Sequence, residues 1–341
     1  MRGLHDTQIM TFEVIFSRRV KEWALDGLRN EIGDTRIATV DDSEHRVRFL
    51  GVENWFHMDK NILIFVLGAL AASILLLTMV PGSPEGLVVA VIAFTVLWIV
   101  SLPLRNASIV DIFWGAGFIV IGLFYLVKSP QTPDFRGLLV LALTVIWGLR
   151  LTLHLAVRNT GAGEDFRYAA WREETGPAFW WKSFFKVFLL QAVVLWIVSS
   201  PMLLAWRDSG KPAITLLDVI GIGLWIFGFV FESVADLQLA LFKRDPANKG
   251  SIMNTGLWSL SRHPNYFGEA VLWWGIGIVA LSAGGWLALI GPALITFSLV
   301  RVSGVAMLDA GLVERRPGYA EYIRTTPAFL PLPRPRKNHT P

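Results

Sequence analysis

The sequence predicts an all-α fold: a multi-pass transmembrane helical bundle of about seven or eight spans, with a polar mouth on the cytosolic side. Hydrophobic residues make up 53% of the 341 residues and charged residues only 17%, a balance typical of membrane-embedded chains. The apolar residues gather in runs of about 20, the length that crosses a bilayer as a helix. Fifteen tryptophans are enough to line both membrane interfaces.

Eight apolar runs are the candidate spans. The stretch 86–127 could divide differently, so the count holds to within one span. The run at 213–242 is longer than a bilayer requires, and we expect it to tilt or to project from the membrane. The runs lie near 61–80, 86–104, 108–127, 137–157, 184–206, 213–242, 266–283 and 286–303.

Basic residues indicate the orientation. They collect in the loops 158–183 and 243–265 and in the tail after 303, and with eight spans these three segments face one side. Because cytoplasmic loops are enriched in Lys and Arg, we assign this side and both termini to the cytosol, and the protein to the inner (cytoplasmic) membrane. The net charge of only +4 fits basic loops better than nucleic-acid binding.

Three segments are expected along the chain. Residues 1–57 are polar, lack a strong period and show no secretory signal, so they are predicted to be a poorly ordered N-terminal extension. Met58 directly precedes the first apolar run and would make a normal start, which suggests an over-extended reading frame. Residues 58–330 form the membrane domain, and residues 331–341 form a Pro/Arg-rich tail.

Several kinds of site are excluded or disfavoured. The chain has no cysteine, which rules out disulfides, thiolate catalysis and Cys-based metal sites. No metal is expected, because His154 and His263 are the only histidines near the polar end of the bundle and no HExxH spacing occurs. No GxSxG motif supports a serine nucleophile either.

The segment Gly256–Glu269 is the main site candidate. It opens directly into an apolar run, so its polar side chains lie at a membrane boundary. Pro264 suits the first turn of a helix, and Asn265 and Glu269 would then share one helix face. An acid and an amide there are unfavourable unless they are paired or used by a ligand.

The fourth span carries a polar stripe. Arg150, His154 and Arg158 recur every four residues along its cytosolic half. They are either snorkelling cations with a histidine paired inside the bundle, or a wall that receives an anionic ligand such as a nucleotide phosphate.

The sixth span carries a second stripe. Glu232, Asp236 and Lys243 share one helix face at the end of an apolar run, so the two acids are not expected to face lipid. They predict either a salt-bridge cluster with Arg150 or Arg158, or hydrogen bonds to a polar cofactor.

Three weaker features complete the polar set. Asp111 is an isolated acid of the third span, suited either to proton donation or to pairing with Arg150. The loop Thr160–Tyr168 lacks a dinucleotide fingerprint and is expected to be a plain loop. The segment 301–324 is amphipathic and is either a surface anchor or a lid over the mouth of the bundle.

The motif HPNYFGE, the upstream D-x6-K and the closing RRPGYAEYIRTT together resemble the steroid 5α-reductase-like membrane family. The similarity is strongest to its bacterial branch of unknown function, DUF1295, and covers roughly 60–330. The resemblance implies a helical bundle that binds NADPH in its cytosolic half and reduces a C=C bond conjugated to a ketone in a steroid- or lipid-like substrate. The expected partners are this substrate and membrane lipids, with no nucleic acid.

The resemblance also assigns residues. Asn265 and Glu269 match the Asn and Glu of the family's N-x-x-G-E motif, which contact the nicotinamide end. Lys243 stands where the steroid enzymes use Arg, and Glu232 stands where they have Asn. The full set of expected cofactor-binding residues is Arg158, His154, Asp236, Lys243, Arg262, Asn265 and Glu269.

The expected catalytic residues are Glu269, Asp111 and Tyr266. The steroid enzymes hold the ketone with an adjacent Gln-Glu pair, which is missing from the early spans here, so Asp111 is the early-span candidate for that role. Hydride from NADPH would add to the β-carbon of an enone while Asp111 or a protonated Glu269 stabilises the enolate oxygen.

Two other functions stay open. One is an S-adenosylmethionine-dependent methyltransferase of the isoprenylcysteine or phospholipid type, because those enzymes look similar around R-H-P-x-Y-x-G. They usually carry a Glu-Glu pair in the last span, where this chain has Leu308-Asp309. The other is a non-enzymatic carrier, which would tolerate Asn265→Ala and Glu269→Ala.

Overall fold

The computed structural model describes residues 52–128, 135–161, 163–206, 214–302 and 318–333, together with 305, 309, 312–313 and 316. The chain divides into one unit over 1–50, which lies outside the described residues, and a second over 51–341. Helix α2 begins at Val52, so the first helix starts before the boundary expected at 58. The expected extension 1–57 and the tail 331–341 otherwise lie mostly outside the described residues and stay predictions.

The described part of the chain is helical and contains no strand, which confirms the all-α prediction. Seven helical segments of it are long and apolar enough to cross a membrane. They are Asn61–Met79 within α2 (Val52–Met79), α3 (Ser83–Leu104), α4 (Ile109–Lys128), α5 (Phe135–Asn159), the run Phe166–Ala205, α10 (Leu216–Arg244) and α11 (Pro264–Gly284).

The eighth expected span is present as a shorter apolar segment, Trp286–Val302. It begins with the 3-10 turn η5 (Trp286–Leu289), continues as α12 (Ile290–Phe297) and ends as the π-helical η6 (Ser298–Val302). Seven long helices plus this short one agree with the predicted count.

The fifth span begins earlier than expected. The prediction placed it at 184–206, whereas the helical run starts at Phe166. Asp165 caps the first helix of the run by accepting a hydrogen bond from the Arg167 N–H. The run comprises α6 (Phe166–Thr175), η1 (Gly176–Ala178), α7 (Phe179–Ser183), the π-helical η2 (Phe184–Leu189), α8 (Leu190–Val198) and α9 (Ser200–Ala205).

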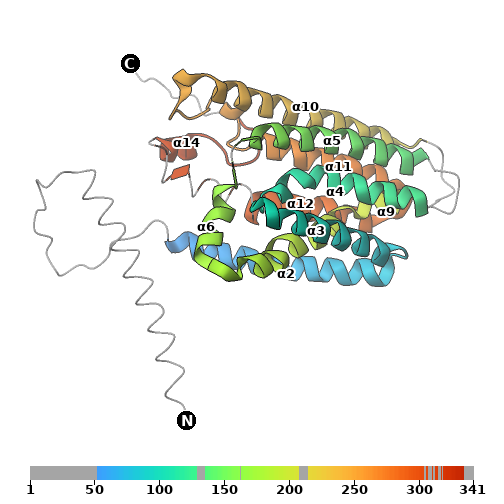
Figure 1. Ribbon diagram of the computed structural model, residues 1–341. Helices are drawn as coiled ribbons and strands as arrows, with labels where there is room; N and C mark the ends of the chain where they lie inside the picture. Colours follow the sequence, from blue (N-terminus) through green and yellow to red (C-terminus); the bar gives the residue numbers. More distant parts are fainter. Residues whose placement is uncertain are drawn as a thin grey trace, which may run out of the picture. The chain divides into compact units, whose positions relative to one another are not determined.

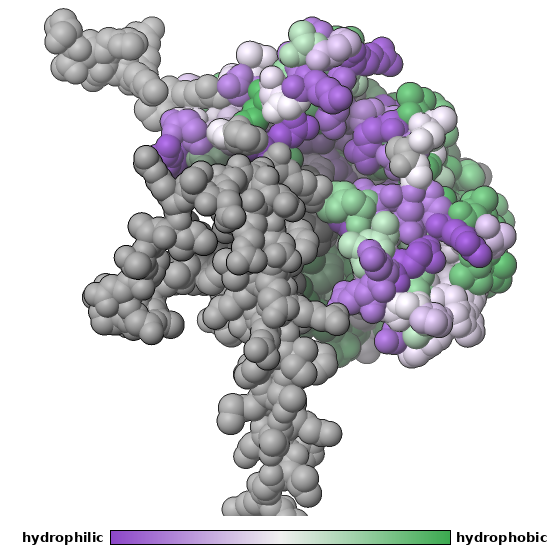
Figure 2. Space-filling view, turned by 60° about the vertical axis from the view of Figure 1, so that its left-hand side comes forward, coloured by the Kyte–Doolittle hydropathy of each residue, from purple (hydrophilic) through white to green (hydrophobic). Residues whose placement is uncertain are grey.

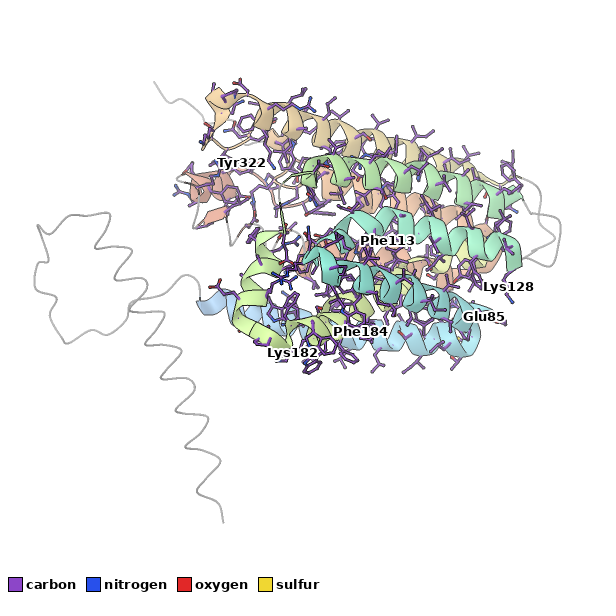
Figure 3. All side chains as sticks on the ribbon, viewed as in Figure 1. Glu85, Phe113, Lys128, Lys182, Phe184 and Tyr322 are labelled. Carbon is purple, nitrogen blue, oxygen red and sulfur yellow. The ribbon has the colours of Figure 1, made fainter. Side chains whose placement is uncertain are left out.

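The long helices lie side by side, and one end of the bundle gathers the polar segments (Figure 1). We call this the polar end: it is formed by α6, the C-terminal ends of α5 and α10, the N-terminal end of α11 and the short α14 (Tyr319–Thr325). Hydrophilic residues collect on it, whereas the side of the bundle carries hydrophobic surface (Figure 2). Tyr322 lies at this end, and Glu85 and Lys128 lie at the other (Figure 3). The three basic segments therefore meet at one end, and their placement in the cytosol stays a prediction.

Glycines bring α10 and α11 close together. A Cβ on Gly268 would lie 2.6 Å from the backbone nitrogen of Glu232, and one on Gly228 would lie 2.5 Å from the carbonyl oxygen of Gly268. Small residues at such crossings let helix backbones pack closely in a membrane. The glycine of the HPNYFGE motif thus sets Glu232 directly against the turn of α11 that carries Glu269.

An aromatic cluster fills the bundle between α4, α5 and α11. The ring centroid of Trp273 lies 4.6 Å from that of Phe118 and 5.2 Å from that of Trp147, and all three side chains are fully buried. Edge-on and tilted contacts of this kind stabilise beyond the area they bury. Trp147 also reaches the polar end through its indole N–H, so the apolar core holds part of the site.

Candidate functional site

Arg150 of α5 is the centre of the ionic cluster. It forms ion pairs with both acids of α10, Glu232 and Asp236. The Trp147 Nε1 donates to Glu232 Oε2 at 3.1 Å, and Glu232 is only 2% exposed. The predicted alternative of a salt-bridge cluster is therefore confirmed with Arg150 as the cation. Buried acids need such partners, because an unpaired carboxylate inside a bundle is strongly unfavourable.

Asp236 joins three helices. Asn265 of α11 donates to Asp236 Oδ1 from its Nδ2 at 3.1 Å. His154 of α5 places its Nε2 3.6 Å from Asp236 Oδ2, a charged contact only when the imidazole is protonated. The structure therefore brings together the predicted residues His154, Asp236 and Asn265.

Glu269 lies one turn after Asn265 on α11 and is partly buried. Arg150 and Asp236 act on it electrostatically, with opposite signs. Among the described residues its carboxyl group takes part in no hydrogen bond. It is therefore the acid of this cluster that is available to a ligand or a proton.

Three cations gather next to the cluster. Lys243 at the end of α10 is an electrostatic neighbour of Arg158 at the end of α5 and of Arg316 in the C-terminal segment. None of the three forms an ion pair with a carboxylate in the described part of the chain. The only side-chain bond of Arg158 there is from its Nε to the neighbouring Asn159 Oδ1, at 3.1 Å. Because these three positive charges repel one another, their proximity favours the binding of an anion between them.

Arg316 is the residue that sequence reasoning missed as a site member. It belongs to the amphipathic segment that was expected to anchor or to cover the mouth of the bundle. The sequence offered a weak signal, since the paired arginines of RRPGY stand in the basic tail after residue 303.

Arg262, one of the expected cofactor-binding residues, contacts the C-terminal segment. Its Nη2 donates to Asp309 Oδ2 at 2.6 Å, and its Nη1 donates to the carbonyl oxygens of Thr326 at 2.6 Å and Ile323 at 3.2 Å. Arg262 is only 8% exposed. Its guanidinium therefore attaches the C-terminal segment to the N-terminal end of α11.

Asp309 is the acceptor at the centre of this attachment. His263 Nε2 lies 3.1 Å from Asp309 Oδ1, and the Tyr319 hydroxyl donates to the same oxygen at 2.7 Å. Burial would raise the pKa of Asp309, but the hydrogen bonds from His263, Arg262 and Tyr319 lower it to about 2. Asp309 is thus a carboxylate at neutral pH, and we call Arg262, His263, Asp309 and Tyr319 the tail clamp.

Asp111 pairs with residues of α6 and not with Arg150, the partner considered from the sequence. Arg167 Nη2 donates to Asp111 Oδ2 at 2.9 Å, and the Tyr168 hydroxyl donates to Oδ1 at 2.9 Å. Arg167 is shared with Asp165, at 2.8 Å. Asp111 therefore fastens the start of α4 to the start of α6.

The loop before α6 is fixed by Glu164. Its Oε1 accepts from the Ala107 backbone N–H at 2.7 Å, and both its oxygens accept from Arg172 at 2.8 Å. Burial would raise the pKa of Glu164, but these hydrogen bonds hold it below the usual value. The expected plain loop is therefore an ordered connection to the start of α4.

Tyr266 contacts the tail clamp through His263 and is an electrostatic neighbour of Glu269. Its ring stacks on His263 with centroids 5.5 Å apart and planes 5° from parallel. Glu269, Arg158 and Arg167 all act on its hydroxyl electrostatically. The predicted catalytic residues Glu269 and Tyr266 thus lie together on α11, whereas Asp111 belongs to a separate ionic group with Arg167 and Tyr168.

Comparison with known proteins identifies the family. Residues 97–326 match the family described as "Protein of unknown function (DUF1295)". An uncharacterized protein of Schizosaccharomyces pombe is 30% identical over 221 residues, which are 55% of this chain and 61% of that protein, so the chain spans about six tenths of its length. No solved structure matches the chain significantly.

Two further relatives have more specific names. A probable O-methyltransferase, ustE of Ustilaginoidea virens, is 40% identical over 65 residues, or 19% of this chain and 22% of that protein. The cobalt-zinc-cadmium resistance protein CzcN of Cupriavidus metallidurans is 28% identical over 141 residues, or 41% of this chain and 61% of that protein. Because the family match covers most of the membrane bundle, the chain belongs to the DUF1295 family, a branch of the steroid 5α-reductase-like group of membrane proteins.

Proposed function

We propose that the protein is a membrane-embedded, NADPH-dependent reductase of a conjugated C=C bond in a steroid- or lipid-like substrate. The observation that carries the proposal is the group of three cations, Arg158, Lys243 and Arg316, beside the cluster of Asp236, Asn265 and Glu269. NADPH has a pyrophosphate and a 2′-phosphate, so a site for it needs several positive charges near polar groups for its nicotinamide amide.

The residues present fit such a cofactor. Arg158 can grip a phosphate with two parallel N–H groups, whereas Lys243 supplies a compact point charge. An anion would relieve the mutual repulsion of these cations, which no carboxylate of the described residues neutralises through an ion pair. Asn265 and Glu269, one turn apart on α11, are the groups suited to the uncharged end of the cofactor.

The chemistry divides between cofactor and protein. Bound here, NADPH would supply a hydride to the β-carbon of an enone. Glu269 would hold the proton beside the substrate, because Asp111 is already engaged by Arg167 and Tyr168. Tyr266 would orient the substrate next to Glu269. We infer a lipid-like substrate because the site lies at one end of a bundle whose sides are apolar.

The same proposal includes the orientation. Basic segments are typical of cytoplasmic loops, and three of them meet at the polar end. We therefore place the protein in the inner (cytoplasmic) membrane, with the polar end and both termini in the cytosol. The polar end would then face the compartment in which NADPH is available.

A methyltransferase is the second candidate, favoured by the similarity to the probable O-methyltransferase of Ustilaginoidea virens. S-adenosylmethionine carries a cationic sulfonium, an amine and a single carboxylate. Acids such as Glu269 would attract it, but three neighbouring cations would repel its positive groups. The charge distribution supports the reductase over this alternative.

Ligand binding to the detergent-purified full-length protein tests the proposal. NADPH, NADH and S-adenosylmethionine are titrated separately by calorimetry. We expect NADPH to bind most tightly, and the double variant Arg158→Gln, Lys243→Gln to lose roughly 100-fold in affinity, since a hydrogen bond to a charged group contributes about 1.5–3 kcal/mol. The control is Lys128→Gln, which removes a positive charge at the opposite end of the bundle (Figure 3) and should bind as the wild type does.

The outcomes separate the candidates. Binding of S-adenosylmethionine alone would overturn the reductase and support the methyltransferase, and binding of none of the three would support a carrier. Glu269→Gln should still bind NADPH but lose turnover with an enone lipid. Unchanged turnover would exclude Glu269 as the proton-holding group.

A further inference from the structure

The start of the fifth membrane run carries an exposed aromatic and basic surface that the proposed function does not use. Trp180, Trp181 and Phe185 are 56%, 44% and 57% exposed, and the neighbouring Lys182 and Lys186 are exposed as well. We call these five residues the aromatic–basic surface. Lys182 and the neighbouring Phe184 lie along the outer side of the bundle (Figure 3). Both lysines are spaced four residues apart across the junction of α7 and η2, so they project from the same side of the run.

The two ammonium groups rest on tryptophan rings. Lys186 Nζ lies 4.5 Å from the ring centroid of Trp171, and Lys182 Nζ lies 5.8 Å from that of Trp181. Both distances are within the range of cation–π attraction. In the part of the chain that the structure describes, neither ammonium group forms an ion pair with a carboxylate. The two positive charges are therefore held by aromatic faces and remain available to an anion.

The aromatic part of the surface is also fixed in place. The Trp98 ring of α3 stacks on Trp180 with centroids 6.4 Å apart, and its indole N–H donates to the Trp180 carbonyl oxygen at 2.9 Å. Phe184 also packs against Trp98, in a tilted arrangement with centroids 5.0 Å apart. The π-helical turn η2 begins at this contact, and such turns occur frequently at functional sites.

The position of the surface along the membrane run indicates its surroundings. The apolar stretch 187–205 that follows is about as long as the ~20 residues that cross a bilayer. Lys182 and Lys186 therefore stand at the polar boundary of that stretch, at the level of lipid headgroups. Tryptophan is enriched at this level because its ring is amphipathic.

We propose that the aromatic–basic surface binds the headgroup of an anionic phospholipid from the surrounding leaflet. The ammonium groups of Lys182 and Lys186 would contact the lipid phosphate, and Trp181 and Phe185 would pack against its glycerol and first acyl carbons. A zwitterionic lipid offers the same phosphate but adds a cation that the two lysines repel. The surface therefore selects lipids with net negative charge.

Lipid binding by the full-length protein in detergent, followed by native mass spectrometry, tests this proposal. Phosphatidylglycerol and phosphatidylcholine of equal chain length are titrated, with glycerol 3-phosphate as a competitor that lacks acyl chains. We expect the wild type to prefer phosphatidylglycerol and glycerol 3-phosphate not to compete. The double variant Lys182→Gln, Lys186→Gln should bind phosphatidylglycerol about 30-fold more weakly, since one lysine near an anionic membrane contributes about fivefold.

The matched control is Lys128→Gln, Lys249→Gln, which has the same net charge and should keep the preference. Equal binding of the two lipids by the wild type would overturn the proposal, as would a lipid preference retained by Lys182→Gln, Lys186→Gln. Competition by glycerol 3-phosphate would also overturn it, in favour of a soluble phosphate ligand. All four lysines are exposed, so these variants are expected to fold.

Discussion

Replacing Arg150 by methionine should destabilise the protein strongly, because it leaves two acids of α10 without their shared cation. The Arg150 side chain is 17% exposed and that of Glu232 only 3%. Removal of one partner of a buried ion pair costs roughly 3–5 kcal/mol. We expect a value near the lower end, since Asp236 keeps some contact with solvent and with His154.

The cause can be separated from lost packing by a second substitution. Glu232→Gln removes one uncompensated charge, while its amide oxygen can still accept the Trp147 N–H bond. The double variant Arg150→Met, Glu232→Gln should therefore recover about 2 kcal/mol relative to Arg150→Met, within the range of coupling between residues in contact. The free energy of unfolding is measured by titration with denaturing detergent in mixed micelles.

Arg158→Met is the control, because Arg158 is exposed on the same helix two turns later and has no ion-pair partner among the described residues. It should change the free energy of unfolding by less than about 0.5 kcal/mol. The reasoning is refuted if Arg150→Met costs less than about 1 kcal/mol, or if Glu232→Gln adds to its cost.

Two further substitutions test the packing of α11 and the tail clamp. Gly268→Ala should destabilise the protein by about 1–3 kcal/mol and weaken NADPH binding, because the new Cβ would lie 2.6 Å from the backbone nitrogen of Glu232. The control is Gly223→Ala, whose Cβ would meet nothing within 4 Å and which should be neutral or slightly stabilising. Thermal unfolding measures the stability of the two variants, and ligand titration measures their NADPH affinity. Equal effects of the two substitutions would show that the close packing of α10 against α11 at Gly268 is not the cause. Asp309→Asn should remove about 2 kcal/mol of stability at neutral pH. The pKa of Asp309 is lowered from the ordinary value of 3.8 to about 2, so the carboxylate stabilises the fold fully at a pH above 3.8. This stabilisation is lost as the pH falls through 2. Because the asparagine cannot titrate, the stability of the variant should depend less steeply on pH between pH 4 and 2. An unchanged acid limb would show that the clamp does not carry this stability.

The membrane bundle was predictable because its signals are local. Apolar runs of sufficient length marked the seven long helices, and Pro264 marked the start of α11. The start of the fifth run was missed for an equally local reason. Gly176 and Pro177 look like a helix break, but a 3-10 turn carries the chain from α6 into α7 across them.

The pairing of charges was only partly predictable. The spacing placed Glu232 and Asp236 on one face of the sixth span and Arg150 in the polar stripe of the fourth span. A salt bridge between the two spans was therefore one of the two predicted alternatives. Spacing could not choose the cation, because that depends on how the helices are rotated against each other. The same limit applies to Asp111, whose partner is Arg167 of α6 and not Arg150.

Two arginines illustrate this limit, because their positions in the sequence did not indicate their partners in the fold. Arg262 adjoins the HPNYFGE motif, and proximity in sequence suggested a ligand contact, but its carbonyl partners Ile323 and Thr326 lie about sixty residues away in the chain. Arg316 stands far from the motif in sequence and yet joins Arg158 and Lys243. The tail clamp connects these facts, because it holds the segment that carries Arg316 against the end of α11. An anion bound by the three cations would therefore also strengthen the attachment of that segment, and the ligand and the clamp would stabilise one another.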